Sequence, residues 1–251
     1  MSALILALVA GAVVGLALGG LGGGGSVLAV PALIYLLGFT PVAATTASLI
    51  IVAFTSAAGL SAHARDGYVR WRTGLLFAAA GIGPAMLGGA LAGRLPGAVL
   101  TVAFALVAGA AAIRMLRPRA AVSEGAVRAV RPGRAAVAGA GLGLVTGVLG
   151  VGGGFLAVPA LVGVLGMRMR AAVGTSLLVI TVNSLAALAL RAGTADGLDW
   201  AVVGPFTAAA VLGAWDGKRL AARLPGRALR RLFAVALLGV ACFMLVDAVA
   251  R

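Results

Sequence analysis

Gly19-Gly20-Leu21-Gly22-Gly23-Gly24-Gly25-Ser26-Val27-Leu28-Ala29-Val30-Pro31-Ala32-Leu33 is a glycine cluster followed by a short apolar segment. The chain uses this stretch a second time, as Gly147-Val148-Leu149-Gly150-Val151-Gly152-Gly153-Gly154-Phe155-Leu156-Ala157-Val158-Pro159-Ala160-Leu161. An apolar stretch long enough for a helix precedes each copy. Glycine costs about 1 kcal/mol relative to alanine within a helix, so the clusters predict a break in the helix at both places.

The composition indicates an all-α integral membrane protein. Of the 251 residues, 62% are hydrophobic and only 10% are charged, whereas about one quarter of a soluble domain is charged. Several apolar runs approach the roughly 20 residues needed to cross a hydrocarbon core about 30 Å thick. The net charge of +14 does not indicate nucleic-acid binding, because the arginines lie in short loops between apolar segments, without interleaved aromatic residues. With one histidine, one cysteine and six acidic residues, the chain predicts neither an enzyme nor a cofactor or metal site.

Ten apolar segments fall into two sets of five. Between the sets lies a polar, Arg-rich stretch that contains Pro118 and Pro132. We therefore predict a first transmembrane repeat over 1–116, a basic cytoplasmic linker over 117–133 and a second transmembrane repeat over 134–251. The predicted segments are 2–20, 26–38, 41–62, 73–93 and 97–116 in the first repeat, and 134–149, 155–166, 170–190, 199–217 and 228–249 in the second.

The two halves are an internal duplication. A shift of 128 residues aligns 11–38 with 139–166, and 17 of these 28 positions are identical. The shift grows to 129 later in the chain, where Arg94-Leu95-Pro96-Gly97 aligns with Arg223-Leu224-Pro225-Gly226. The matching Gly and Pro positions make a chance similarity between two apolar sequences unlikely.

The distribution of positive charge predicts the topology, because Lys and Arg are enriched in cytoplasmic loops. With four spans per half, the better orientation puts 11 Lys/Arg inside and 9 outside, which is no bias. With five segments per half and the N-terminus outside, 17 lie inside and 3 outside. Five is an odd number, so the second repeat is inverted relative to the first and both termini are outside. We expect the cytoplasmic (inner) membrane of a prokaryote as its location.

The segments 26–38 and 155–166 are too short to cross a membrane upright, since they extend only about 18–20 Å as helices. We expect each to meet the preceding helix at a glycine break near the membrane midplane. Irregular backbone at that depth is tolerated only against protein or a water-filled cavity. Breaks at matching positions in two halves indicate the binding site of a transporter.

The repeated motif, written Gly-x-Gly-Gly-Gly-Phe-Leu-x-Val-Pro-Ala-Leu in the second half, resembles the sulfite exporter TauE/SafE family, also called the four-toluene-sulfonate uptake permease (TSUP) family. The resemblance covers nearly the whole chain and includes the Gly-Thr-Ser stretch at 174–176. It implies a small membrane transporter for sulfur-containing anions such as sulfite, sulfonates or thiosulfate. The first copy departs from the motif, with Gly25-Ser26-Val27 where the second has Gly153-Gly154-Phe155, so the two half-sites need not contribute equally.

The glycine clusters are the first candidate binding residues. Glycine lets backbone amides turn toward a cavity, and the following short helix presents its positive N-terminus to an anion. We expect Pro31 and Pro159 in the first turns of these helices, where proline is tolerated. The alternative is close helix packing through small residues, which suits the four-residue spacing of Gly11, Gly15 and Gly19. The candidates are Gly22, Gly23, Gly24, Gly25, Ser26, Pro31, Gly150, Gly152, Gly153, Gly154 and Pro159.

Polar residues within apolar helices are the second set of candidates. Hydroxyl and amide groups supply hydrogen-bond donors to an oxyanion without a competing negative charge. The alternative is hydrogen bonding between helices, worth under about 1 kcal/mol each on average. Asn183 is the most informative, because its amide is the most costly to place in lipid. The candidates in this set are Thr46, Ser48, Thr175, Ser176 and Asn183.

The sequence thus predicts transport of a small sulfur-containing anion by alternating access of two inverted repeats in a lipid bilayer. An inside-negative potential favours anion exit by about 2.3 kcal/mol per charge per 100 mV, and no mid-membrane carboxylate suggests a proton relay. We therefore expect export or potential-driven facilitated movement. A channel for a small solute and a non-transporting membrane scaffold or assembly factor are the alternatives, and the anion and the oligomeric state stay open.

Overall fold

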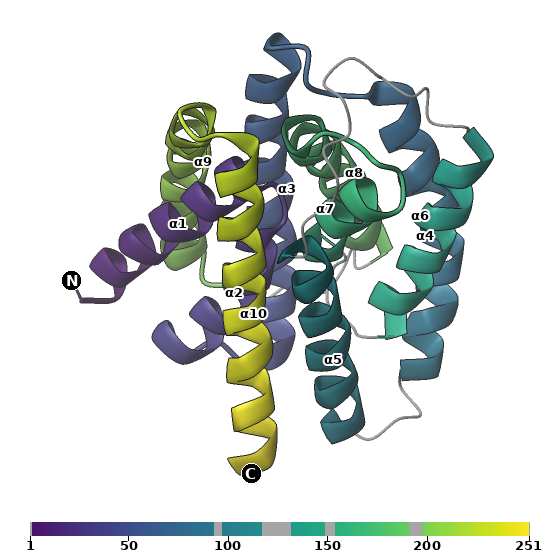
Figure 1. Cartoon of the computed structure of the whole chain (residues 1–251). Coiled ribbons are helices and arrows are strands. Elements are labelled where there is room, and N and C mark those ends of the chain that lie inside the picture. The colour runs from purple at the N-terminus through teal and green to yellow at the C-terminus, as the bar shows by residue number, and fades with distance from the viewer. Residues whose placement is uncertain (1, 93–96, 117–131, 149–153, 191–197, 251) are drawn as a thin grey trace.

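The chain folds into packed helices. A computed structural model of the whole chain describes residues 2–92, 97–116, 132–148, 154–190 and 198–250 (Figure 1). No strand occurs within these ranges. The elements are α1 (Ser2–Leu21), α2 (Gly24–Pro31), the π-helix η1 (Ala32–Leu36), α3 (Pro41–Arg65), α4 (Trp71–Ala92), α5 (Gly97–Leu116), α6 (Pro132–Val148), α7 (Gly154–Gly163), α8 (Met169–Leu190), α9 (Trp200–Ala222) and α10 (Gly226–Ala250).

Each of the ten predicted segments corresponds to a helix, but several boundaries were wrong. The helices α3 and α9 extend to Arg65 and Ala222, beyond the predicted ends at 62 and 217. Long basic side chains can keep their charge in water while the helix continues. Pro132 was placed in the linker but is the first residue of α6, a position where its missing N–H costs nothing. Most of the predicted linker, 117–131, lies outside the described residues.

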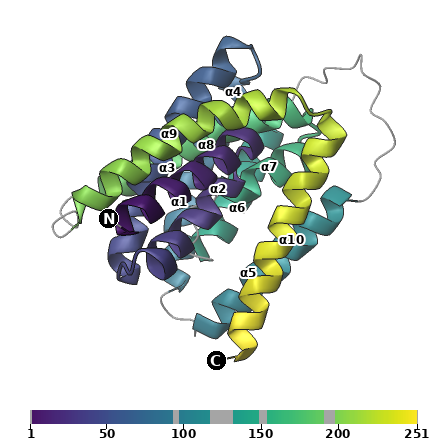
Figure 2. The ribbon, with the colours of Figure 1, turned by 90° about the vertical axis from the view of Figure 1, so that its left-hand side faces the viewer.

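The helices pack in pairs that cross the boundary between the two halves. The closest pairs are α1 with α9, α4 with α6, α5 with α10, and α3 with α8. Figures 1 and 2 show α3, α7 and α8 within the bundle, while α5 and α10 lie together at one side of it. Because α1 corresponds to α6 and α4 to α9 in the duplication, the first two pairs are equivalent contacts.

The α1–α9 pair is closely packed through glycine. A Cβ atom built on each of three α1 glycines would overlap a backbone carbonyl oxygen of α9. Van der Waals packing of this kind holds helices together where lipid supplies no hydrophobic drive. Both sets of residue numbers rise together, so the two helices run parallel: Gly11 faces Phe206, Gly15 faces Ala210 and Gly19 faces Ala214.

The α6–α4 pair repeats this packing at the corresponding positions. Gly139 faces Phe77, Gly143 faces Gly81 and Gly147 faces Ala85, again through backbone carbonyl oxygens. These pairs follow from the α1–α9 pairs by the shifts of 128 and 129 residues that relate the halves. The duplication seen in the sequence is therefore also present in the helix packing, and the glycines at spacing four serve the packing role that was the alternative to binding.

The central pair, α3 and α8, runs antiparallel. The backbone at Gly174 lies beside His63, Leu177 lies beside Gly59, and the Thr181 hydroxyl donates to Ser56 Oγ at 2.9 Å. The α3 numbers fall as the α8 numbers rise. Because α3 and α8 are equivalent helices of the duplication, their antiparallel packing bears on how the two repeats are oriented relative to each other.

Each short helix ends in a left-handed glycine. Gly38 has φ +71° and Gly166 has φ +68°, and both occupy corresponding positions after the short helices. The following amides complete equivalent bonds of 3.0 Å, from Phe39 to the Leu33 carbonyl and from Met167 to the Leu161 carbonyl. Glycine is favoured there because L side chains rarely adopt positive φ.

Proline within the short helices lies later than predicted. Pro31 is the last residue of α2, and Pro159 is the sixth residue of α7, so neither is in a first turn. Proline lacks the N–H that an α-helix needs. The backbone after Pro31 continues as the π-helix η1, whose hydrogen bonds span five residues instead of the four of an α-helix.

Three described helices are long and apolar enough to span a membrane by length and composition: Leu4–Leu21, Ala43–Arg65 and Met169–Ala189. Two of these belong to the central pair, α3 and α8. The described part of α7, Gly154–Gly163, is apolar but too short, as the sequence predicted.

Candidate functional site

The first glycine break consists of Gly22 and Gly23, between α1 and α2. Gly22 has φ +82°, and its N–H donates to the Leu18 carbonyl at 2.8 Å, which closes α1. Gly23 is the N-cap of α2, which has no side-chain cap. The prediction that Gly24 and Gly25 also break the helix was wrong, since both lie in the first turn of α2. The first turn of a helix tolerates glycine because its amides have no intrahelical partners.

Gly25 has a packing role. A Cβ atom on Gly25 would overlap the Val14 carbonyl oxygen and lie 2.5 Å from Leu18 Cβ. The first turn of α2 therefore folds back against α1, and only glycine leaves room for that approach. Consistent with this, α2 packs along α1 as well as against α3.

The first break lies against the start of α7. A Cβ atom built on Gly23 would overlap the Gly154 carbonyl oxygen and lie 2.8 Å from the Cα of Phe155. Gly154 is the first residue of α7, so the N-terminal ends of α2 and α7 lie against each other. Two helix N-termini bring the positive ends of their dipoles into one region, which favours an anion there.

The central helix α8 contributes Ser176 to the same place. A Cβ atom on Gly22 would lie 2.6 Å from Ser176 Oγ and 3.0 Å from the Cα of Val173. Ser176 is fully buried, and its hydroxyl donates to the Val173 carbonyl at 2.8 Å. The Ser176 oxygen is therefore beside the break, with its proton engaged within α8 in this conformation.

Asn183 lies on the same face of α8 as Ser176. Seven residues are about two helical turns, so the two side chains are separated by roughly 10 Å along the helix. The side-chain oxygen of Asn183 is buried, with no hydrogen-bond partner among the residues that the structure describes. A buried polar atom without a partner is uncommon and calls for an explanation.

Thr175 faces away from the break. Its Oγ1 accepts a hydrogen bond from the Arg70 N–H at 3.1 Å, so it joins α8 to the turn between α3 and α4. The structure does not bring Thr175 together with Gly22 and Ser176. Within the Gly-Thr-Ser stretch, Thr175 therefore contacts the α3–α4 turn, whereas Ser176 lies beside Gly22 at the first break.

The equivalent site on the first half is described only in part. Thr46 and Ser48 are buried on α3, and the Ser48 hydroxyl donates to the Thr45 carbonyl at 2.8 Å. Ser48 corresponds to Ser176, and the residue that corresponds to Gly22 is Gly150. Ser26 is in the first turn of α2. The candidates Gly150, Gly152 and Gly153 lie outside the described residues.

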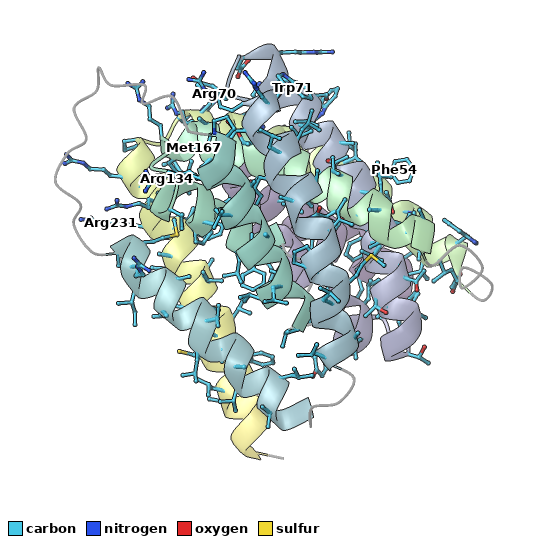
Figure 3. All side chains as sticks on the ribbon, turned by 90° about the vertical axis from the view of Figure 1, so that its right-hand side faces the viewer. Phe54, Arg70, Trp71, Arg134, Met167 and Arg231 are labelled. Atoms are coloured by element: carbon cyan, nitrogen blue, oxygen red, sulfur yellow. The ribbon has the colours of Figure 1, made fainter. Side chains whose placement is uncertain are left out.

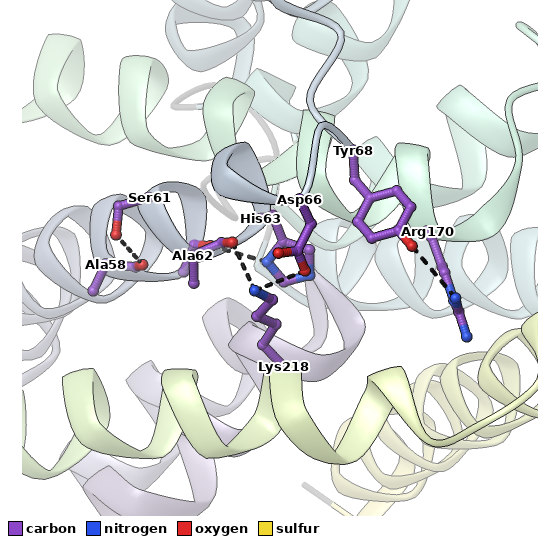
Figure 4. Close-up of polar contacts among 9 residues, drawn as sticks. Ala58, Ser61, Ala62, His63, Asp66, Tyr68, Arg170 and Lys218 are labelled. Atoms are coloured by element: carbon purple, nitrogen blue, oxygen red, sulfur yellow. Dashed lines mark hydrogen bonds and ion pairs between the residues drawn. The ribbon is translucent and has the colours of Figure 1, made fainter.

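Sequence reasoning missed the partners of Lys218. The acidic residue nearest to Lys218 on α9, Asp216, pairs with Arg219 at 3.2 Å. Lys218 instead reaches the first half, where it contacts Asp66 at 2.8 Å and the Ala62 carbonyl at 2.7 Å (Figure 4). These residues are 152 or more positions apart, so only the fold could reveal the contact.

Comparison with known proteins identifies the family. Residues 7–244 match the family described as "Sulfite exporter TauE/SafE". A "Probable membrane transporter protein" from Xylella fastidiosa (strain 9a5c) is 35% identical over 249 residues, covering 96% of this chain and 95% of the relative. A protein of the same description from strain Temecula1 / ATCC 700964 is 34% identical with the same coverage. The chain therefore belongs to the sulfite exporter TauE/SafE family of membrane transporters.

Proposed function

We propose that this protein carries small sulfur-containing anions of the sulfite, sulfonate or thiosulfate type out of the cell. The observation that carries the proposal is the contact of Gly23 with Gly154, which brings the N-termini of α2 and α7 together. The family description names sulfite, which is such an anion.

The chemistry of the surrounding groups favours an anion over a cation. The groups beside the breaks are helix N-terminal amides, the Ser176 hydroxyl and, further along α8, the Asn183 amide. None of these carries a negative charge, and each contains an N–H or O–H that can donate to an oxyanion. Rotation of the Asn183 amide by 180° turns its NH2 toward the position of the unpartnered oxygen.

Alternating access is supported by the relation between the repeats. Equivalent helices α3 and α8 run antiparallel, while α1 with α9 and α6 with α4 run parallel. The predicted topology, with both termini outside, requires the same three directions. We infer that one inverted repeat moves against the other around the breaks, in the cytoplasmic membrane, as in other transporters with broken helices.

Export follows from the membrane potential. A monovalent anion leaves a cell with an interior at −100 mV with about 2.3 kcal/mol in its favour, so no coupling ion is needed. Sulfite-loaded proteoliposomes with an imposed potassium-diffusion potential should lose sulfite faster when the interior is negative than when it is positive. Equal rates at both signs would contradict potential-driven movement of an anion. Flux of a neutral solute of similar size, unaffected by voltage, would indicate a channel instead.

Asn183→Asp should weaken anion binding more than Asn183→Ala does. The alanine variant loses a hydrogen bond to a charged ligand, which corresponds to roughly 10- to 100-fold in affinity. The aspartate variant keeps the shape but adds a negative charge that repels the anion. Thermal-shift titrations with sulfite, thiosulfate and a small sulfonate would rank the anion affinities of the wild type, Asn183→Ala and Asn183→Asp. If the aspartate variant bound these anions as well as the wild type, Asn183 would not contact the substrate.

A further inference from the structure

A group of polar contacts holds the two halves together at one end of α3. Lys218 Nζ on α9 lies 2.8 Å from Asp66 Oδ2 and 2.7 Å from the Ala62 carbonyl oxygen (Figure 4). Ala62 is in the last turn of α3, where carbonyl groups lack intrahelical partners and carry partial negative charge. Lys218 therefore caps α3 and neutralises Asp66 with the same ammonium group. Its side chain is only 20% exposed, so solvent screens these contacts less than a surface ion pair.

The turn that follows α3 is also fixed to α8. Besides the Arg70–Thr175 bond, Arg170 Nη1 lies 3.5 Å from the Tyr68 hydroxyl. The other terminal nitrogen of Arg170 donates to the Ala222 and Leu224 carbonyls at the end of α9. Arg170 thus links the α3–α4 turn of the first half to the end of α9 in the second.

Gly174 allows the turn to lie close to α8. A Cβ atom on Gly174 would be 3.2 Å from the Tyr68 carbonyl oxygen and 3.4 Å from His63 Cβ. Those distances are tighter than most Cβ contacts, so a larger residue would lift the turn from the helix. Apart from the Arg170 bonds to Ala222 and Leu224, which lie within the second half, the contacts of this group join the first half to the second.

The duplication does not provide the same group at the other end. Lys218 corresponds to Gly89, Arg170 to Val42 and Thr175 to Ala47. Each position that supplies a cation or hydroxyl in the second half therefore has an apolar or side-chain-free counterpart in the first. The two ends of the bundle cannot be closed by equivalent contacts.

We propose that Lys218, Arg170 and Thr175 form a one-sided gate with the α3–α4 turn, and that this gate is closed in the structure. The inference rests on the proposed alternating access. The charge distribution of the sequence predicts that the gate lies on the cytoplasmic side. Figure 3 shows Arg70 of the α3–α4 turn at the top of the view, and Arg134 and Arg231 along its left-hand side. Release of Lys218 from Asp66 and Ala62 frees the end of α3 from α9, and release of the turn from Thr175 and Arg170 frees it from α8. Together these steps open a path from that side to the break between α1 and α2.

Cysteine labelling tests the gate without any substrate. In a Cys242→Ser background, Ser176→Cys places a thiol at a fully buried position beside Gly22. Adding Lys218→Gln should speed its reaction with a membrane-impermeant maleimide by roughly tenfold or more, the factor that corresponds to one charge-assisted hydrogen bond. The faster reaction is expected only in vesicles that expose the gate side to the reagent. Labelling of Arg219→Cys identifies those vesicles, because Arg219 is exposed and lies beside Lys218 on α9.

Arg219→Gln is the matched control, since it removes an exposed ion pair within α9 one residue away. It should leave the labelling rate of Ser176→Cys unchanged. Asp66→Asn provides a second opening variant, and Lys218→Arg, which keeps a cationic donor at this position, should keep labelling slow. Equal rates for Lys218→Gln and Arg219→Gln, or faster labelling from both membrane sides, would overturn the gate. If labelling behaves as expected but no anion is transported, the gate stands and the proposed substrate fails.

Discussion

Gly22→Ala is expected to lower anion flux at least tenfold, because the new methyl group collides with α8 at the first break. Its Cβ would lie 2.6 Å from Ser176 Oγ and 3.0 Å from the Cα of Val173. Ser176 can rotate, but the Val173 backbone cannot move without shifting α8. Alanine also adopts the left-handed conformation of Gly22 poorly, at about 1–2 kcal/mol. Flux from proteoliposomes, normalised to folded protein, measures the loss.

Gly38→Ala is the control for that backbone cost. Gly38 also has positive φ, +71°, but nothing lies within 4 Å of a Cβ built there. It should therefore lose a similar amount of stability and retain most of the flux. If Gly22→Ala and Gly38→Ala reduced flux equally, the effect would be general strain, and the position of Gly22 against α8 would have no part in transport.

Gly143→Ala is expected to destabilise the folded protein by about 1–3 kcal/mol or more, the usual range for overpacking. Its Cβ would overlap the Gly81 carbonyl oxygen and lie 2.7 Å from the Gly81 Cα, so α6 must move away from α4. Gly15→Ala should have a similar effect, because Gly15 faces the equivalent carbonyl of Ala210 in the other half. Heating in detergent, with the fraction of protein that stays monodisperse measured at each temperature, gives the loss of stability of both variants.

Gly141→Ala on the same helix is the matched control. Nothing lies within 4 Å of its Cβ position, and alanine is the better helix former by about 1 kcal/mol. It should unfold at the same temperature as the wild type or slightly higher. An unfolding temperature for Gly143→Ala as high as that of Gly141→Ala would contradict the close approach of α4 and α6.

Much of the fold could be predicted from the sequence because the relevant signals are local. Apolar runs located all ten helices, and the contiguous glycines located the break between α1 and α2. Helix ends were less certain, since hydrophobicity stops at the lipid boundary whereas a helix such as α3 continues to Arg65. The extent of the break was overestimated for a related reason: Gly24 and Gly25 have helical backbone because α2 packs against α1.

The sequence did not predict which helices of one half pack against which helices of the other. The four-residue spacing of Gly15 and its neighbouring glycines indicates close packing with another helix. Nothing in the adjacent sequence identifies α9 as that helix. The same limit applies to Lys218, whose local acidic neighbour Asp216 pairs with Arg219 while Lys218 binds Asp66 in the other half. Of the candidate site, Gly22, Gly23, Gly154 and Ser176 come together, and Thr175 makes a structural contact instead.

The central claim is that one anion binds where the N-termini of α2 and α7 meet. Selenite is a heavier analogue of sulfite whose selenium gives an anomalous diffraction signal. In crystals grown with selenite, the account predicts an anomalous peak within hydrogen-bonding distance of the first-turn amides of α2 and of the Ser176 hydroxyl. A selenite peak elsewhere in the protein, with none between Gly23 and Gly154, would contradict it.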